Sequence, residues 1–262
     1  MQMFTLEQYA YSNNLRQIHP LEKATFTLVT LIIVQLANSM VVSLGAMALM
    51  TGLTVLKAGI PGRLWLKMLG IPGVFLGMGA MVLMVSVQLG GTVQFGTWAW
   101  QLGPWSLQIL LDQWPKALLL LMKGLASVSC LYFLTFTTPM VELLALLRTV
   151  KLPALFVELT ELVYRFIFVL LDTAVAIFTA QEARLGYSGL AVSFRSLGTL
   201  ISMLFLKSYH RATQMQWALE VRGYEGQMRV LRQEYHFSQG NWVRITVVQV
   251  LLITMAVYVG GR

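Results

Sequence analysis

The residues best suited to specific recognition are two arginines, Arg184 and Arg222, which lie 38 positions apart in near copies of one short sequence. The first copy reads Ala-Gln-Glu-Ala-Arg-Leu-Gly-Tyr-Ser-Gly over 180–189, and the second reads Ala-Leu-Glu-Val-Arg-Gly-Tyr-Glu-Gly over 218–226. One additional residue, Leu185, stands before the glycine of the first copy. A guanidinium group makes paired hydrogen bonds to carboxylates, or bonds to helix-end carbonyls, so these residues favour docking to an acceptor surface over covalent chemistry.

Each copy has the sequence pattern of a helix C-terminus. An alanine, Ala180 or Ala218, precedes the arginine by four positions and therefore lies on the same helix face. The glycine that follows, Gly186 or Gly223, is the usual terminator, and a basic last turn suits the negative end of the helix dipole. Two ordinary helix ends would explain the arginines and glycines. They would not explain why alanine, glutamate and tyrosine are repeated too.

The composition places these helix ends in an integral membrane protein. Of the 262 residues, 57% are hydrophobic and 11% are charged, against roughly 25% charged in soluble domains. The net charge of +8 is explained by basic loops on one side of a membrane, so no nucleic-acid partner is expected. The single cysteine, Cys130, excludes an intramolecular disulfide. The first twenty residues are too polar for a cleavable signal peptide, so the first crossing is expected to direct insertion.

Apolar stretches separated by basic loops predict an all-α polytopic protein with about five transmembrane helices. The expected crossings are 24–37, 40–56, 66–89, 113–138 and 243–259. A turn joins the first two near Asn38. Residues 90–111 carry no charge and are rich in tryptophan, which fits the outer interface. The N-terminus and the basic loops are then cytoplasmic, in a multi-pass protein of the cell membrane.

The part after Pro139 is richer in charge and is expected to form long coupling helices. A short amphipathic helix over 141–150 precedes helices over 154–185 and 192–222. The last of these is roughly 45 Å long, enough to leave the membrane and enter the cytoplasm. Whether helix 154–185 is embedded or interfacial stays open.

We therefore divide the chain into three parts. Residues 1–138 form the N-terminal membrane region, 139–240 hold the cytoplasmic coupling helices, and 241–262 hold the final crossing.

The sequence contains no pattern expected of an enzyme. There is no Walker A motif, no glycine-rich phosphate loop and no histidine or cysteine cluster at metal-binding spacing. The pair Arg165 and Asp172, seven positions apart, favours a structural ion pair over a transport site. No catalytic residue, metal site or cofactor is expected on this chain.

The pattern resembles the transmembrane T component of energy-coupling factor (ECF) transporters, most closely the cobalt/nickel, CbiQ-like branch. The resemblance covers essentially the whole chain. It includes His-Pro-x-x-Lys over 19–23, Leu-Pro over 152–153, Ala-Gln-Glu-Ala-Arg over 180–184 and Ala-x-x-x-Arg-Gly-Tyr-x-Gly over 218–226. In that family two Arg-Gly motifs end two long cytoplasmic helices, and each inserts into a groove of one of two ATPase subunits. A separate small membrane protein captures the substrate.

The resemblance implies a non-catalytic coupling subunit of an ATP-driven importer, which transmits ATPase motion to the substrate-binding subunit, with ATP bound by the partner ATPases. The implied ATPase-coupling residues are Ala180, Ala183, Arg184, Gly186, Ala218, Arg222 and Gly223. The first copy departs from the family, since Leu185 separates its arginine and glycine. Cobalt, nickel and a vitamin remain open as substrates. Two other classes also remain open, namely a self-contained transporter and a membrane enzyme or assembly factor with unrecognised active residues.

Overall fold

The computed structural model describes residues 2–89, 98–102, 105–109, 113–149, 152–224 and 239–260. Two compact units divide the chain: unit 1 comprises 1–142 and 234–262, and unit 2 comprises 143–233. The helices of unit 1 are α1 (Gln2–Ser12), α2 (Pro20–Leu36), α3 (Met40–Gly52) with its π-helical extension η1 (Leu53–Lys57), α4 (Gly62–Met84), α5 (Trp114–Thr137) and α9 (Gln239–Gly260). Helix α6 (Met140–Thr149) leads into unit 2, which contains α7 (Ala154–Glu182) and α8 (Leu190–Val221).

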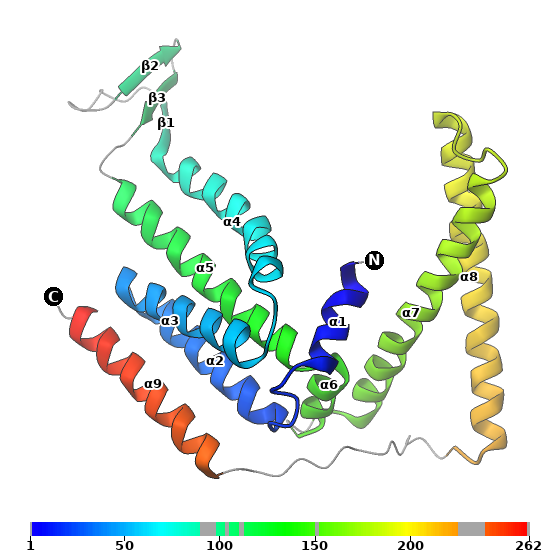
Figure 1. The fold of residues 1–262 in the computed structure, drawn as a ribbon. Coiled ribbons are helices and arrows are strands. Elements are labelled where there is room, and N and C mark those ends of the chain that lie inside the picture. Colours follow the sequence, from blue (N-terminus) through cyan, green and yellow to red (C-terminus); the bar gives the residue numbers. More distant parts are fainter. Residues whose placement is uncertain are drawn as a thin grey trace. The chain divides into compact units, whose positions relative to one another are not determined.

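Helix α5 is the centre of unit 1, because α1, α2, α3 and α4 all pack against it (Figure 1). Helix α9 packs on α2 and α3. Phe26 of α2, Met50 of α3 and the Cys130 and Phe133 positions of α5 form one buried cluster. These apolar contacts hold α2, α3 and α5 together in the bundle of unit 1.

Local signals set the start of α2 where the sequence predicts it. Pro20 occupies the first turn, where its missing N–H is not needed. The His19 Nδ1 atom accepts a 3.1 Å hydrogen bond from the Leu21 backbone N–H and so caps the helix. The predicted turn between the first two crossings is confirmed, since α2 ends at Leu36 and α3 begins at Met40.

The N-terminal segment is tied to the end of α5 by buried polar contacts. Asn13 Nδ2 donates to the Phe136 carbonyl at 3.2 Å, and Lys23 Nζ donates to the Thr137 carbonyl at 2.9 Å. The last carbonyls of a helix have no partner within it, so these side chains supply donors that α5 lacks. The C-terminal end of α5, the end of α1 and the start of α2 are thereby fixed to one another.

A small antiparallel sheet joins α4 to α5 and corrects one predicted crossing. Its strands are β1 (Val85–Leu89), β2 (Trp98–Leu102) and β3 (Trp105–Ile109), in the order β1-β3-β2. The sequence predicted a helix through Leu89, whereas α4 ends at Met84. Val-Ser-Val-Gln-Leu alternates apolar and polar residues with period two, which is a strand pattern. The rest of the predicted outer-interface segment lies outside the described residues.

Unit 2 is an antiparallel helical hairpin made by α7 and α8 (Figure 1). Both helices begin and end within three residues of the predicted bounds. The predicted ion pair between Arg165 and Asp172 is wrong, since neither side chain has an ionic partner within the described residues. Seven positions of helix separate their Cα atoms by about 10 Å, too far for that pair.

Length and composition make six of the described helical segments suitable for crossing a membrane. They are Met40–Lys57, Gly62–Leu83, Trp114–Thr137, Leu155–Glu182, Leu190–Val221 and Gln239–Tyr258. Helix α2, with 17 residues, is at the lower limit of about 17 for a spanning helix. The chain is thus a multi-pass, all-α membrane protein with a small accessory sheet.

Candidate functional site

The first arginine copy folds into the turn that joins α7 to α8. The Gly186 N–H donates to the Gln181 carbonyl at 2.9 Å, and the Leu185 N–H donates to the Glu182 carbonyl at 3.0 Å. Leu185 itself is left-handed, with φ 60°. This pair of bonds around a left-handed residue is a Schellman motif, and it places Arg184 at the C-cap of the helix.

Side chains lock this turn against the start of α8. Gln181 Nε2 donates to the Ser196 carbonyl at 3.0 Å, and Ser196 Oγ donates to the Gly186 carbonyl at 2.7 Å. The Tyr187 hydroxyl donates to Gln181 Oε1 at 2.8 Å, while its ring lies 4.7 Å from that of Phe178. A Cβ atom on Gly186 would come within 2.8 Å of the Gln181 carbonyl oxygen. Glycine is therefore required here because of close packing.

The second copy forms the same motif at the end of α8. The Tyr224 N–H donates to the Leu219 carbonyl at 3.0 Å, and the Gly223 N–H donates to the Glu220 carbonyl at 3.0 Å. Gly223 is left-handed, with φ 70°. Arg222 therefore occupies the C-cap, as Arg184 does in the first copy. Gly226, which completes the second copy in sequence, lies outside the described residues.

When the two copies are aligned on their arginines, their backbone hydrogen bonds correspond residue for residue with no gap. Leu185 corresponds to Gly223, since both follow the arginine and both are left-handed. Gly186 corresponds to Tyr224, since the N–H of each closes the longer bond of the motif. The extra residue apparent in sequence is thus a leucine in the position that the second copy gives to glycine. Glycine at 186 allows the close packing of the turn, whereas glycine at 223 allows the left-handed backbone conformation.

The arginines and the alanines around them lie on the open surface of unit 2. Arg184 and Arg222 are exposed, as are Ala180, Ala183 and Ala218. Apolar side chains next to the arginines are exposed as well, Leu185 at 74% and Val221 at 90%. A flexible cation surrounded by small and apolar residues is a surface that a partner can cover closely.

The arginines stand at opposite ends of the hairpin. Arg184 lies beside the turn between the helices, whereas Arg222 ends α8 near the beginning of α7. The Tyr224 hydroxyl fixes that second end by donating to Glu158 Oε2 at 3.0 Å. Because α7 has 29 residues, the two arginines are about 44 Å apart along the helix axis.

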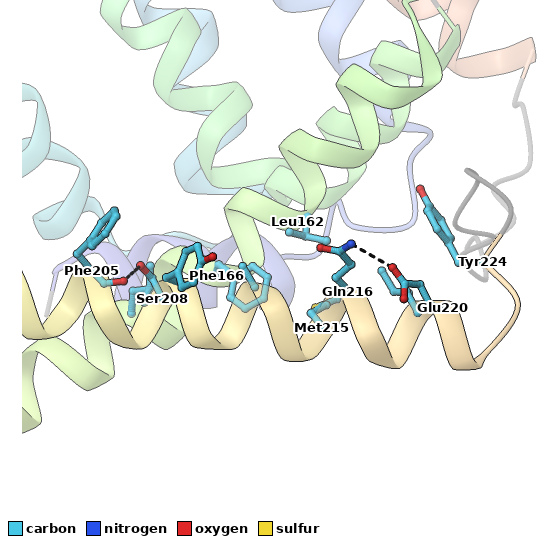
Figure 2. Close-up of a pocket in the computed structure, with 12 residues that line it drawn as sticks. Leu162, Phe166, Phe205, Ser208, Met215, Gln216, Glu220 and Tyr224 are labelled. Atoms are coloured by element: carbon cyan, nitrogen blue, oxygen red, sulfur yellow. Dashed lines mark hydrogen bonds between the residues drawn. The ribbon is translucent and has the colours of Figure 1, made fainter.

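Between its two ends the hairpin opens into an apolar groove of about 770 Å³ (Figure 2). Leu162 and Phe166 of α7 face Phe205 and Met215 of α8 across it, and Tyr224 lies at one end. Ser208, Met215 and Leu219 of α8 also line this groove. Their spacings of seven and four positions place them on one face of α8, which turns toward α7.

The supporting residues Glu158, Gln181 and Ser196 were not singled out from the sequence. The tyrosine repeated in both copies was the available signal. Tyr187 and Tyr224 each bind a side chain that holds their arginine turn in place. Their hydrogen-bond partners come from positions 6 and 66 residues away, and the second separation is not readable from local pattern. The hydrogen bond to Glu158, followed by burial and repulsion from that carboxylate, raises the pKa of Tyr224 above its ordinary 10.0.

The hairpin and the helical bundle define a class: a polytopic membrane protein that presents paired helix-end arginines. A family model described as cobalt transport protein, CbiQ, matches residues 11–233. The chain belongs to the CbiQ family of cobalt transport proteins and is a membrane component of cobalt transport.

Curated relatives include one uncharacterized protein and others named as cobalt transport proteins. The chain is 32% identical over 251 residues to an uncharacterized protein of Methanocaldococcus jannaschii, covering 96% of this chain and 92% of that one. It is 34% identical over 178 residues to the cobalt transport protein CbiQ of Rhodobacter capsulatus, covering 68% and 67%. It is 32% identical over 234 residues to a putative fused cobalt transport protein CbiMQ of Methanocorpusculum labreanum, covering 89% of this chain and 38% of that longer protein.

Proposed function

We propose that this chain is the coupling subunit of an ATP-driven cobalt importer, in which Arg184 and Arg222 each dock into one of two ATPase subunits. The observation that carries the proposal is the repetition of one cap geometry at two exposed arginines. Two copies of one docking surface suit two copies of one partner. The implied residues Ala180, Ala183 and Ala218 leave room beside each guanidinium for that partner to approach.

Docking of both arginines to ATPases constrains how α7 and α8 lie relative to the membrane. Both helices are long and apolar enough to cross a bilayer. If they crossed it, arginines about 44 Å apart would stand on opposite sides of a hydrocarbon core about 30 Å thick. Two ATPases that work in one compartment require both arginines on one side. The hairpin therefore lies along the cytoplasmic surface, with the N-terminus of the chain on the same side.

The remaining parts of the importer come from partners. ATP is bound and hydrolysed by the ATPase subunits, and this chain has no catalytic role. A small membrane subunit captures the substrate and covers apolar surface of the hairpin, where side chains such as Phe156, Val175 and Phe194 are exposed. The family favours cobalt as the transported ion, with nickel as the closest alternative and a vitamin as a more distant one. The residues that bind the transported ion lie on the small membrane subunit.

The experiment is copurification of the ATPases with single and double arginine variants. Arg184→Ala and Arg222→Ala together should abolish ATPase association, while the variant still inserts into the membrane. Each buried charged contact at an interface is worth on the order of 2–5 kcal/mol when one partner is removed. Lys207→Ala with Arg211→Ala is the matched control, since both are exposed basic residues in the middle of α8, away from the caps. Full ATPase retention by the cap double variant would refute the proposal.

A further inference from the structure

A second cavity, which charged and apolar residues line together, lies in unit 1 where the ends of four helices meet. It has a volume of about 180 Å³ and is lined by the start of α2, the end of η1, the end of α5 and the start of α9. Its polar lining residues are Glu22, Lys23, Lys57, Asn241 and Arg244. Since helix ends meet there, the cavity is at the level where a membrane bundle meets water.

The two inner polar residues of this cavity, Lys23 and Glu22, are buried and hydrogen-bonded to neighbouring helices. Lys23 is 4% exposed and donates to the Thr137 carbonyl at 2.9 Å. Glu22 is fully buried, and its Oε2 atom accepts a 3.2 Å hydrogen bond from Asn241 Nδ2. These hydrogen bonds join α2 to both α5 and α9. The buried side of the cavity is therefore closed by side chains that are fixed in place.

The outer residues are two exposed cations, Lys57 and Arg244. Neither side chain has a hydrogen-bond or ionic partner in the part of the chain that the structure describes. With Lys23, three cations line the cavity together with one carboxylate, that of Glu22. The carboxylate of Glu142 also acts on Lys23, and one positive charge is left over, so the cavity attracts an anion. Arginine and lysine on neighbouring helices are suited to a phosphate group.

The other walls are apolar and continue onto the lipid-facing side of α9. Leu53, Phe133 and Ile245 line the cavity. Next to Arg244, Val247 and Leu251 stand one helical turn apart and are 58% and 61% exposed. A free inorganic anion gains nothing from such a surface, whereas an acyl chain does. The volume is below the roughly 300 Å³ of pockets for whole small molecules, and it suits a headgroup whose chains remain outside.

We propose that this cavity binds the phosphate headgroup of an anionic phospholipid, with the acyl chains lying along Val247 and Leu251. The lipid bridges the ends of η1 and α9, because one phosphate reaches both Lys57 and Arg244. This site is independent of the arginine turns of unit 2 and of the coupling function proposed for them.

The test measures thermal stabilisation of the purified full chain by phosphatidylglycerol, with phosphatidylcholine and inorganic phosphate as parallel arms. Phosphatidylglycerol should stabilise the wild type more than either. Lys57→Gln with Arg244→Gln should weaken its apparent affinity about 25-fold, because each basic residue near an anionic lipid contributes about fivefold. The control is Arg63→Gln with Lys67→Gln, which removes the same charge from exposed residues of α4 that do not line the cavity.

A second variant, Ile245→Trp, fills the cavity without a change of charge and should also weaken the phosphatidylglycerol effect. Equal losses in the cavity and control double variants would assign the effect to general surface charge and overturn the proposal. Equal stabilisation by inorganic phosphate would make the site one for a free anion, which also overturns it. The proposal would also be overturned if the Lys57/Arg244 double variant bound phosphatidylglycerol as well as the wild type does. It would be overturned as well if the wild type bound phosphatidylcholine equally well.

Discussion

Leu185 and Gly223 adopt the same left-handed backbone conformation, with φ 60° and 70°, each directly after the arginine that caps its helix. The structure thus builds two equivalent turns from different residue types. Glycine adopts this conformation without steric cost, whereas leucine does not. The first turn carries strain that the contacts of Gln181 and Ser196 must hold.

Leu185→Gly should stabilise the α7–α8 hairpin. The left-handed conformation costs a non-glycine residue about 1–2 kcal/mol, and the greater backbone freedom of glycine offsets about 0.5–1 kcal/mol of that gain. We expect the free energy of unfolding to rise by about 0.5–1 kcal/mol, measured by thermal or denaturant unfolding in detergent. Leu190→Gly is the control, because Leu190 is 83% exposed and begins α8 with helical backbone. Destabilisation by both substitutions would contradict the strain at Leu185.

Alanine at the two turn glycines should destabilise for different reasons. Gly223→Ala meets nothing within 4 Å, so its cost is the left-handed backbone, about 1–2 kcal/mol. Gly186→Ala brings Cβ to 2.8 Å from the Gln181 carbonyl oxygen and 2.9 Å from Ser196 Oγ, and we expect a cost of about 1–3 kcal/mol from that overpacking. Gly189→Ala is the control, since Gly189 is extended and has open space around it. Equal stability of all three variants would show that neither constraint exists.

Tyr224→Phe should loosen the end of the hairpin that carries Arg222, because it removes the hydrogen bond to Glu158. That bond raises the pKa of Tyr224 above 10.0. Its stabilisation is therefore complete below pH 10 and is lost as the pH rises through the raised value. The difference in Tm between wild type and variant should be constant at neutral pH and shrink in alkali. Tyr209→Phe, at a 63% exposed tyrosine of α8, is the control and should show no such pH dependence. A pH-independent difference would contradict the bond.

Lys23→Met should destabilise unit 1, because the Thr137 carbonyl loses a buried donor at the end of α5. The Thr137 carbonyl keeps a longer bond of 3.4 Å from Asn13 Nδ2, so we expect the variant to lose the net value of one hydrogen bond, about 0.5–1.5 kcal/mol. Lys67→Met, which alters an exposed lysine of α4, should change the free energy of unfolding by less than about 0.5 kcal/mol. If the two variants unfolded at the same denaturant concentration, the capping role of Lys23 would be wrong.

The helix boundaries were predictable because their signals are local. The His-Pro pair at 19–20 sets the start of α2, and the arginine copies mark the ends of α7 and α8. The position of a small residue in a bundle is not local in this way. Gly73 and Gly77 of α4 have the spacing of a small-residue packing face, but a Cβ on Gly77 would have nothing within 4 Å and one on Gly73 would make an ordinary 3.6 Å contact with Leu125. The tight approach is at Gly124 of α5, where a Cβ would lie 2.8 Å from Leu76.

The candidate site likewise combines local features that the sequence predicts with long-range contacts that it does not. Its arginines, Arg184 and Arg222, could be found from the sequence because they repeat. The contact that holds the Arg222 end of α8 against α7, between Glu158 and Tyr224, joins residues 66 positions apart. Long-range pairing of this kind is set by the packing of α7 on α8, so a single sequence does not contain it in readable form. Whether the arginines couple to ATPases stays a prediction.

Cysteine accessibility tests the central claim most directly, because it reports the side of the membrane on which each arginine lies. The one native cysteine, Cys130, is buried and is first replaced by alanine, after which Arg184→Cys and Arg222→Cys are made separately. Both cysteines should resist a membrane-impermeant maleimide in intact cells and react in inside-out vesicles. Reaction of one of them from outside intact cells would mean that the hairpin crosses the membrane, and the coupling account would be wrong.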